Sequence, residues 1–405
     1  MLYSVHEMQR AATASVRTAM QAGQMFMRHP LNPMAHTDAG RRAAAAYELL
    51  DYTTRRRSKP EFGLKTVNTD AGPVPIEEVA VLREPFCRLL HFKRAGCEKL
   101  PRLLVVAPLS GHFATLLRGT VEALLPEHDV YITDWIDARD VPVARGRFDL
   151  DGYIDYVMTF LRHLGPGTHV MAVCQPSVPV LAAAALMAED NDPARPKSMI
   201  LMGGPIDTRV NPTAPNDLAQ SQSLQWFERN VITSVPMSYP GFLRRVYPGF
   251  LQLTGFMTMN LDRHMTAHWN LYEHLVEGDG DSVAAHQKFY DEYLTVMDLP
   301  AEYYLQTVKA VFQDHALPEG TFHWRDRKVD PGAITDIGLL TVEGELDDIS
   351  GVGQTRAAHD LCRNLPESMK RHHHQPATGH YGIFSGRRWR NEILPRVHEA
   401  VLAAN

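Results

Sequence analysis

The segment Thr168–Met187, THVMAVCQPSVPVLAAAALM, gives the clearest indication of the fold. Its apolar opening, Thr168–Val173, has the length and composition of a buried strand, and the Ala-rich segment Ser177–Met187 is typical of a helix. Between them, Cys174-Gln175-Pro176 forms a tight turn. The proline is compatible with this position because the first turn of a helix needs no backbone donor from it. The stretch therefore predicts a strand, a sharp elbow and a helix.

Cys174 is the candidate nucleophile of this elbow. A thiol there lies beside a helix N-terminus, whose partial positive charge favours the attacking thiolate form. The alternative is a small buried hydrophobic residue, as most free cysteines are. The order of residues along the chain favours catalysis, because an acidic residue follows a later strand and a histidine follows the last one. Ser177 is a rival nucleophile, but its position in the first helical turn favours backbone capping.

The acid candidates follow the apolar segment Ile337–Val342, which is predicted to be a strand. Open α/β sheets place functional groups just past the carboxyl ends of parallel strands. Asp347 and Asp348 both lie there, in the sequence EGELDDI. The alternative for this acidic cluster is a solvated loop or the cap of a helix over Val352–Leu361, with Asp348 as the capping residue.

The base candidate is His380, in the sequence TGHYGIF. Glycines flank the His-Tyr pair, so the loop can present an imidazole sideways to a cleft. A short predicted strand before it contains three consecutive histidines, His372–His374. Because adjacent strand residues point to opposite faces, these three side chains cannot converge on one ion, and we expect no metal site and no cofactor.

Three motifs together resemble a known family. They are Cys174-Gln175-Pro176, EGELDDISG at residues 343–351 and GHYGIF at residues 379–384. These motifs are similar to those of the intracellular poly(3-hydroxybutyrate) depolymerases, the cysteine-nucleophile branch of the α/β-hydrolases. The resemblance covers nearly the whole chain, since it extends to the segments YEL at 47–49, KPEFGL at 59–64 and GGPID at 203–207.

The resemblance implies an α/β-hydrolase fold and a triad of Cys174, Asp347 and His380. It selects Asp347 over Asp348 through the Gly-x-x-Asp spacing. The oxyanion of the reaction needs two backbone N–H donors. We expect these from Gln175 and from the loop after the predicted strand Leu103–Ala107, where Ser110 is the first choice and Leu109 the alternative. His112, in the same loop, could contact substrate or bond to local backbone, and it is left out of the catalytic set.

Related enzymes keep other functions open. Polyhydroxyalkanoate synthases use a similar triad but resemble Gly-x-Cys-x-Gly at the elbow, where this chain has Ala172 and Pro176. The departure favours the depolymerase. The alternatives are a synthase-like acyltransferase using a 3-hydroxyacyl-coenzyme A, thiolysis of the polymer by coenzyme A, and a non-catalytic protein that coats storage granules.

The composition agrees with a soluble intracellular enzyme. The chain has 405 residues, of which 44% are hydrophobic and 22% charged, enough for one large core. The net charge is −6 and the sequence has no basic tract, so nothing in the charge pattern indicates nucleic-acid binding. Four cysteines are no disulfide framework, and a catalytic thiol needs a reducing compartment. Without a signal peptide or a long apolar run, we expect a cytoplasmic protein that does not insert into membranes.

The strand pattern divides the chain into four parts: a helical leader over 1–60, a first core part over 61–207, a cap insertion over 208–335 and a second core part over 336–405. Helices are expected at Ser4–Arg28 and Gly40–Thr54, and the first strands near Phe62–Val67, Val79–Val81 and Cys87–Phe92. Further parallel strands are expected at Asp129–Thr133 and Met199–Met202. No strand is expected between about 208 and 335.

Aromatic residues gather in the cap insertion, which holds 17 of the 34 Phe, Tyr and Trp residues. Among them are Trp226, Phe227, Phe242, Phe250, Phe256, Trp269 and Trp324. Most would form the core of the cap itself. The remainder could contact an insoluble polymer, so the predicted partners are the surface of poly(3-hydroxybutyrate) granules and its oligomers.

Overall fold

An eight-stranded sheet forms the centre of the molecule, and it positions every candidate site residue. The computed structural model describes residues 2–69 and 72–405. The strands lie in the order β15-β14-β8-β7-β5-β6-β4-β3. They are β3 (Glu77–Glu84), β4 (Cys87–Lys93), β5 (Arg102–Val106), β6 (Asp129–Trp135), β7 (Thr168–Val173), β8 (Ser198–Met202), β14 (Gly338–Gly344) and β15 (Lys370–Gln375). The strands from β5 onward pair in parallel, whereas β3 and β4 are antiparallel.

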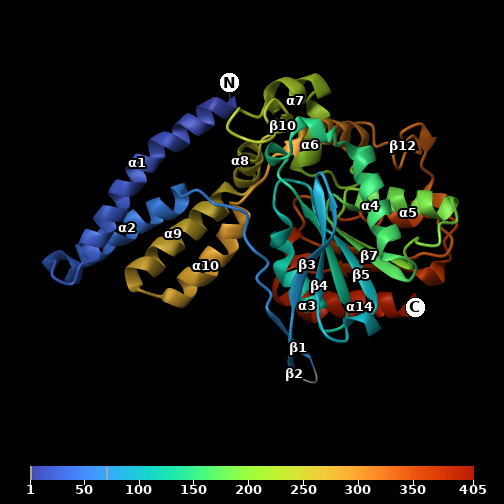
Figure 1. Ribbon diagram of the computed structural model, residues 1–405, viewed down its shortest axis with the longest axis horizontal. Coiled ribbons are helices and arrows are strands. Elements are labelled where there is room, and N and C mark those ends of the chain that lie inside the picture. The colour runs from blue at the N-terminus through green and yellow to red at the C-terminus, as the bar shows by residue number, and fades with distance from the viewer. Residues whose placement is uncertain (1, 70–71) are drawn as a thin grey trace.

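Helices cover both faces of this sheet (Figure 1). They are α3 (Arg118–Leu124), α4 (Leu150–Leu164), α5 (Ser177–Glu189) and α14 (Leu394–Ala403). β7 and β8 are buried along their whole length, as expected for central parallel strands. α5 is apolar on all sides because it packs between the sheet and α4. The predicted strand and helix on either side of Cys174 are thus confirmed.

The N-terminal residues form two helices, as predicted. α1 (Leu2–Arg28) and α2 (Asp38–Thr54) pack against each other, and the Thr37 hydroxyl caps α2 by accepting from the backbone N–H of Gly40 at 3.1 Å. Figure 1 shows this pair beside α9 and α10, at one end of the molecule. Within the described residues, no helix is both long and apolar enough to span a bilayer.

Two predictions about strands were wrong. The segment near Phe62–Val67 does not add a strand to the large sheet, because β1 (Thr66–Thr69) pairs with β2 (Gly72–Pro75) in a separate hairpin. Residues 208–335, the insertion, were expected to lack strands, but they contain five short ones. These are β9 (Thr233–Ser234), β10 (Arg245–Tyr247), β11 (Leu299–Pro300), β12 (His323–Trp324) and β13 (Arg327–Lys328). Runs this short carry no periodic signal, because their pairing depends on contacts between distant segments.

The rest of the insertion is helical. Its α-helices are α6 (Ala214–Ser221), α7 (Leu224–Asn230), α8 (Gly249–Met259), α9 (Leu261–Glu277), α10 (Gly280–Tyr293) and α11 (Ala301–Thr307). None of the insertion's described strands joins the eight-stranded sheet. The chain leaves the sheet after β8 and returns to it at β14, which is the neighbour of β8 in the sheet. Both ends of the insertion therefore lie close to the strands that precede the candidate site residues.

Candidate active site

Cys174 occupies a strained elbow between β7 and α5. Its φ is +70°, in the left-handed region that non-glycine residues rarely adopt. The backbone N–H of Cys174 donates to the carbonyl of Met202 at 2.7 Å, and its own carbonyl accepts from Ser177 N–H at 3.1 Å. These bonds hold the residue in its unusual conformation. Cys174 is half-buried, whereas the other three cysteines, Cys87, Cys97 and Cys362, are buried.

Asp347 lies in the loop after β14 with a fully buried side chain. One carboxylate oxygen, Oδ1, accepts from the backbone N–H groups of Ile349 at 2.9 Å and Ser350 at 2.8 Å. The other, Oδ2, accepts from Nδ1 of His380 at 2.7 Å. Asp348 instead accepts from the side chain of Asn260 at 2.8 Å, on an exposed surface. The carboxylate that meets the histidine is therefore that of Asp347.

The alternative in which Asp348 caps a helix was wrong. The helix expected over Val352–Leu361 is short, since α12 spans only Ala358–Leu361 and has Ala357 at its N-cap. The residues before α12 form turns, and their backbone N–H groups at Gly353, Thr355 and Arg356 donate to the buried carboxylate of Glu343. The Glu343 carboxylate, and not Asp348, therefore accepts the hydrogen bonds of these backbone N–H groups.

His380 is buried in the loop after β15, and its imidazole packs edge-on against Tyr381 and Phe384. Burial opposes the charged imidazolium and lowers the pKa of His380, but the neighbouring groups have the opposite effect. The Asp347 carboxylate and the Cys174 side chain outweigh the effect of burial and hold the pKa of His380 well above its usual range. The structure thus brings all three predicted triad residues together at the carboxyl ends of the parallel strands.

Two glycines make this close approach possible. A Cβ on Gly203, whose φ is +55°, would lie 3.2 Å from Cε1 of His380 and 3.3 Å from Oδ2 of Asp347. A Cβ on Gly344, where β14 ends, would lie 2.4 Å from the carbonyl oxygen of Thr378. Both positions need glycine because the neighbouring atoms occupy the space of a side chain.

The predicted oxyanion donors also lie at the site. Gln175 and Ser110 line the same cavity as Cys174, and Leu109 lines it too. In the part of the chain that the structure describes, the backbone N–H groups of Gln175 and Ser110 donate to no protein acceptor. These groups are available to a ligand, so Gln175 and Ser110 stay the predicted pair.

Other residues considered from the sequence lie outside this arrangement. The ring nitrogen Nε2 of His112 is 2.9 Å from the carbonyl of Tyr293, and burial lowers the His112 pKa to about 4. Ser177 is fully buried against Gly204, so it is inaccessible to a substrate. Its hydroxyl has no partner among the described residues, so the expected capping bond was wrong.

The three consecutive histidines do not share a centre. Nδ1 of His372 is 2.9 Å from the Thr341 hydroxyl, whereas Nε2 of His373 is 2.8 Å from the side-chain oxygen of Gln375. A different group with metal-ligand chemistry is present among the described residues: His91, Cys97 and Asp129, all buried, with their ligand atoms within 4.8 Å of one another. It was missed because its members come from three separate elements. Nε2 of His91 lies 2.7 Å from Oδ1 of Asp129, so an ordinary buried His–Asp hydrogen bond explains the closeness of these two side chains.

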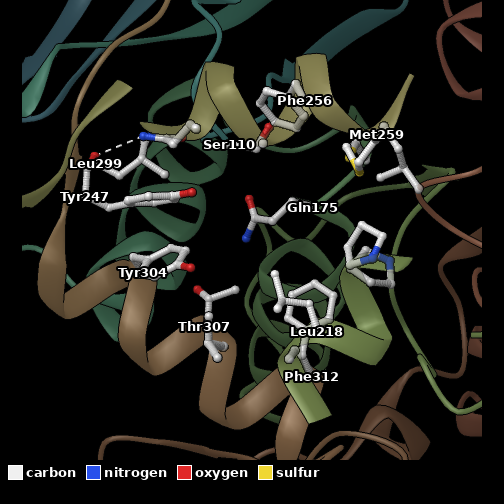
Figure 2. A pocket seen from close by; sticks show the side chains of 18 of the residues that line it. Ser110, Gln175, Leu218, Tyr247, Phe256, Met259, Leu299, Tyr304, Thr307 and Phe312 are labelled. Atoms are coloured by element: carbon white, nitrogen blue, oxygen red, sulfur yellow. Dashed lines mark hydrogen bonds between the residues drawn. The ribbon is translucent and has the colours of Figure 1, made fainter. Parts of the chain in front are cut away.

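A cavity of about 590 Å³ opens beside Cys174. The sheet side supplies Ser110 and Gln175, and the insertion supplies most of the remaining wall (Figure 2). The insertion's contribution is largely apolar and comes from several of its helices; it includes Leu218, Phe227, Tyr247, Phe256, Met259, Tyr303, Tyr304 and Phe312. Ligand sites of roughly 300–1,000 Å³ with apolar walls and few polar groups are typical of small-molecule binding.

The strand order, with a sharp turn after β7 that carries Cys174, a carboxylate after β14 and a histidine after β15, is that of an α/β-hydrolase. The family described as "PHB de-polymerase C-terminus" matches residues 203–405, half of the chain. The chain belongs to this family of poly(3-hydroxybutyrate) depolymerases and is a carboxylic ester hydrolase. No curated protein matches it in sequence.

Solved structures similar to this chain include several hydrolases. The monoacylglycerol lipase of Paleococcus ferrophilus is 13% identical, with a TM-score of 0.43 over 75% of this chain and 95% of that one. The 2-hydroxy-6-oxo-6-phenylhexa-2,4-dienoate hydrolase of Rhodococcus sp. strain RHA1 is 12% identical, with a TM-score of 0.44 over 80% of this chain and 99% of that one. A thermophilic esterase from Thermogutta terrifontis is 15% identical, with a TM-score of 0.39 over 84% and 96%.

Proposed function

We propose that this protein is an intracellular depolymerase that mobilises stored poly(3-hydroxybutyrate) by cleaving its esters through Cys174, His380 and Asp347. The observation that carries the proposal is the convergence of a thiol on a strained elbow with a buried His–Asp pair bonded at 2.7 Å. Structural cysteines do not need such an environment, whereas a nucleophile with a base and an orienting acid does.

The proposed reaction has two halves. His380 takes the proton of Cys174, and the thiolate attacks the ester carbonyl. The backbone N–H groups of Gln175 and Ser110 stabilise the oxyanion, and loss of one such donor typically costs about 3–4 kcal/mol. His380 then gives the proton to the leaving alcohol, so a thioester remains on Cys174. A water that loses its proton to His380 cleaves this thioester and restores the thiol.

The charge arrangement supports a cysteine in this position. Asp347 and Cys174 together keep the pKa of His380 well above its usual range despite burial. An imidazole that readily holds a proton stabilises an adjacent thiolate, the reactive form of cysteine. Asp347 also fixes the ring, because it accepts from Nδ1 and leaves Nε2 for proton transfer.

Contact with a polymer granule is the second part of the proposal. Three of the seven aromatic residues singled out in the insertion are exposed: Trp226, Phe242 and Trp269. Phe227 and Phe256 instead line the cavity, and Phe250 packs on Tyr3. Exposed apolar side chains can adsorb to a water-insoluble polyester through burial of their surface.

Substitution of the nucleophile tests the catalytic proposal. Cys174→Ala should abolish hydrolysis of amorphous polymer and of a soluble ester without unfolding the protein, because one sulfur is removed at a half-buried turn. Cys174→Ser should retain a small fraction of the wild-type activity. Activity of Cys174→Ala within tenfold of the wild type would rule out the thiol as nucleophile.

A thiol-labelling experiment separates the enzyme from a granule-coating protein. An ester-mimicking alkylating probe should react with Cys174 much faster than with the buried Cys87, Cys97 and Cys362. Equal labelling rates would contradict catalysis. Mass spectrometry of the products, with and without coenzyme A, distinguishes hydrolysis from thiolysis, and incubation with 3-hydroxybutyryl-coenzyme A tests for polymer synthesis.

A further inference from the structure

The cavity beside Cys174 contains polar atoms that the protein leaves unpaired. Gln175 projects its side-chain amide into the space between Tyr247 and Tyr304 on one side and Met259 on the other (Figure 2). Only 8% of Gln175 is exposed, yet neither its amide nitrogen nor its amide oxygen has a hydrogen-bond partner among the described residues.

Two hydroxyls that line the same cavity, those of Tyr303 and Thr307, also lack hydrogen-bond partners among the described residues. Tyr303 and Thr307 lie on α11, four positions apart, and therefore on one face of the helix. They are 2% and 6% exposed. A buried polar group without a partner destabilises the folded protein, so three such side chains in one cavity indicate a ligand that pairs with them.

The three groups are also close to the nucleophile. Burial raises the pKa of Tyr303 well above its usual range and the neighbouring Cys174 adds to this effect, whereas the side chains of Thr307 and Gln175, which lie close to the Tyr303 hydroxyl, partly oppose it. Gln175 directly follows Cys174 in the chain. A ligand bound covalently to the thiol would therefore extend past these polar atoms.

The direction of this cavity identifies the part of the substrate that it holds. His380 must face the oxygen of the leaving alcohol in order to protonate it. Cys174 and Gln175 line the cavity, but His380 and Asp347 do not. In the proposed reaction the acyl carbon bonds to Cys174 and its oxyanion faces Gln175, and both residues line the cavity, so the acyl side of the scissile ester is assigned to it.

We propose that Gln175, Tyr303 and Thr307 form a carbonyl-binding subsite for the polyester unit that precedes the scissile ester on its acyl side. This inference rests on the proposed function. A polyester of 3-hydroxy acids repeats a carbonyl acceptor at every unit, and the amide N–H and the two hydroxyls are donors. Its small apolar side groups fit the surrounding apolar wall. A plain alkanoyl chain offers no acceptor there and leaves the three groups unpaired.

The subsite predicts a substrate preference that can be measured directly. The p-nitrophenyl ester of the linear dimer of 3-hydroxybutyrate is compared with that of an unbranched alkanoic acid of equal chain length. The wild type should show a kcat/KM at least tenfold higher for the dimer ester. Sites built to hydrogen-bond a substrate discriminate strongly against analogues that lack the bonding group.

Variants that remove one hydroxyl each should reduce this preference. Tyr303→Phe and Thr307→Val keep the shape of the side chain, and each should lower the ratio of the two kcat/KM values about two- to tenfold, the range expected for the loss of one neutral hydrogen bond. Thr254→Val is the matched control, because Thr254 lines the same cavity but its hydroxyl already donates to the carbonyl of Phe250 at 2.9 Å. This control should leave the ratio unchanged.

The outcomes separate the subsite from the function on which it rests. Full activity of Cys174→Ala on both esters would overturn the proposed function. An inactive Cys174→Ala, together with a wild type that does not prefer the dimer ester, would overturn the subsite alone. Unchanged ratios in Tyr303→Phe and Thr307→Val would do the same. If one of these two variants does not fold, the other still decides the question.

Discussion

Replacing Asp347 with asparagine should disable the enzyme while leaving its fold nearly intact. The Asp347 carboxylate makes three hydrogen bonds, two through Oδ1 to backbone N–H groups and one through Oδ2 to Nδ1 of His380 at 2.7 Å. An amide keeps an oxygen for the two backbone donors but then presents an N–H to the imidazole. His380 must then turn Nδ1 into an acceptor, so its proton moves to Nε2 and the ring cannot accept one from Cys174.

The size of the effect follows from the bond that is lost. A hydrogen bond to a charged group contributes about 1.5–3 kcal/mol, and the wrong tautomer adds to this loss. The same substitution in a serine triad lowers kcat about 10⁴-fold. We therefore expect Asp347→Asn to lower kcat at least about 10³-fold, which is about 4 kcal/mol at 1.36 kcal/mol per factor of ten. KM should change little, because Asp347 does not line the cavity.

Asp348→Asn is the matched control for this experiment. Asp348 bonds to Asn260 at the surface, and exposed polar pairs contribute at most about 1 kcal/mol. Its kcat on a soluble p-nitrophenyl ester should stay within about twofold of the wild type. A larger loss in Asp348→Asn than in Asp347→Asn would show that the wrong carboxylate was assigned. An Asp347→Asn enzyme within tenfold of the wild type would refute the triad reasoning itself.

Three further predictions concern packing, pH and the polymer surface. Gly203→Ala should lower kcat for ester hydrolysis at least about tenfold, because the added Cβ would displace the His–Asp pair. Gly119→Ala should leave kcat unchanged, because Gly119 lies outside the cavity and its added Cβ would meet no neighbouring group within 4 Å. Burial lowers the pKa of His112 to about 4, below the value of about 6.5 in the unfolded chain. Neutral His112 therefore contributes to the stability of the folded protein above about pH 6.5, and this contribution is lost as the pH falls towards 4. Thermal unfolding of His112→Gln should accordingly depend less on pH in this range than that of the wild type. Trp226→Ser and Phe242→Ser should weaken sedimentation with granules but spare soluble esters; equal losses on both substrates would assign these side chains to the core instead.

Much of the fold could be predicted from local pattern. The apolar run before Cys174, the alanines after it and the acid and histidine in the right order specified the strands and loops that carry the site. These signals work because parallel strands buried on both faces must be continuous in apolar residues. The neighbouring capping predictions were wrong at Ser177 and Asp348, since tertiary partners, and not local turns, determine where those side chains lie.

The cavity could not be predicted from local sequence patterns. Its wall combines Gln175 from the elbow with Tyr303 and Thr307 from a helix more than a hundred residues later in the chain. Aromatic enrichment predicted an apolar cap but not which rings face the site. Phe227 and Trp226 are adjacent in sequence, yet one is buried in the cavity wall and the other is exposed. Phe227 packs edge-on against Tyr304 of α11, a contact between segments far apart in the sequence.

The backbone of Cys174 has a consequence for any attempt to make this enzyme more robust. Its φ of +70° costs a side-chain-bearing residue about 1–2 kcal/mol, which exceeds the roughly 0.4–1 kcal/mol by which glycine favours the unfolded chain. Folding on its own would therefore favour glycine at the position where the proposed reaction requires a thiol. A library of variants selected for heat resistance alone should accumulate Cys174→Gly, and its most durable members would be catalytically dead.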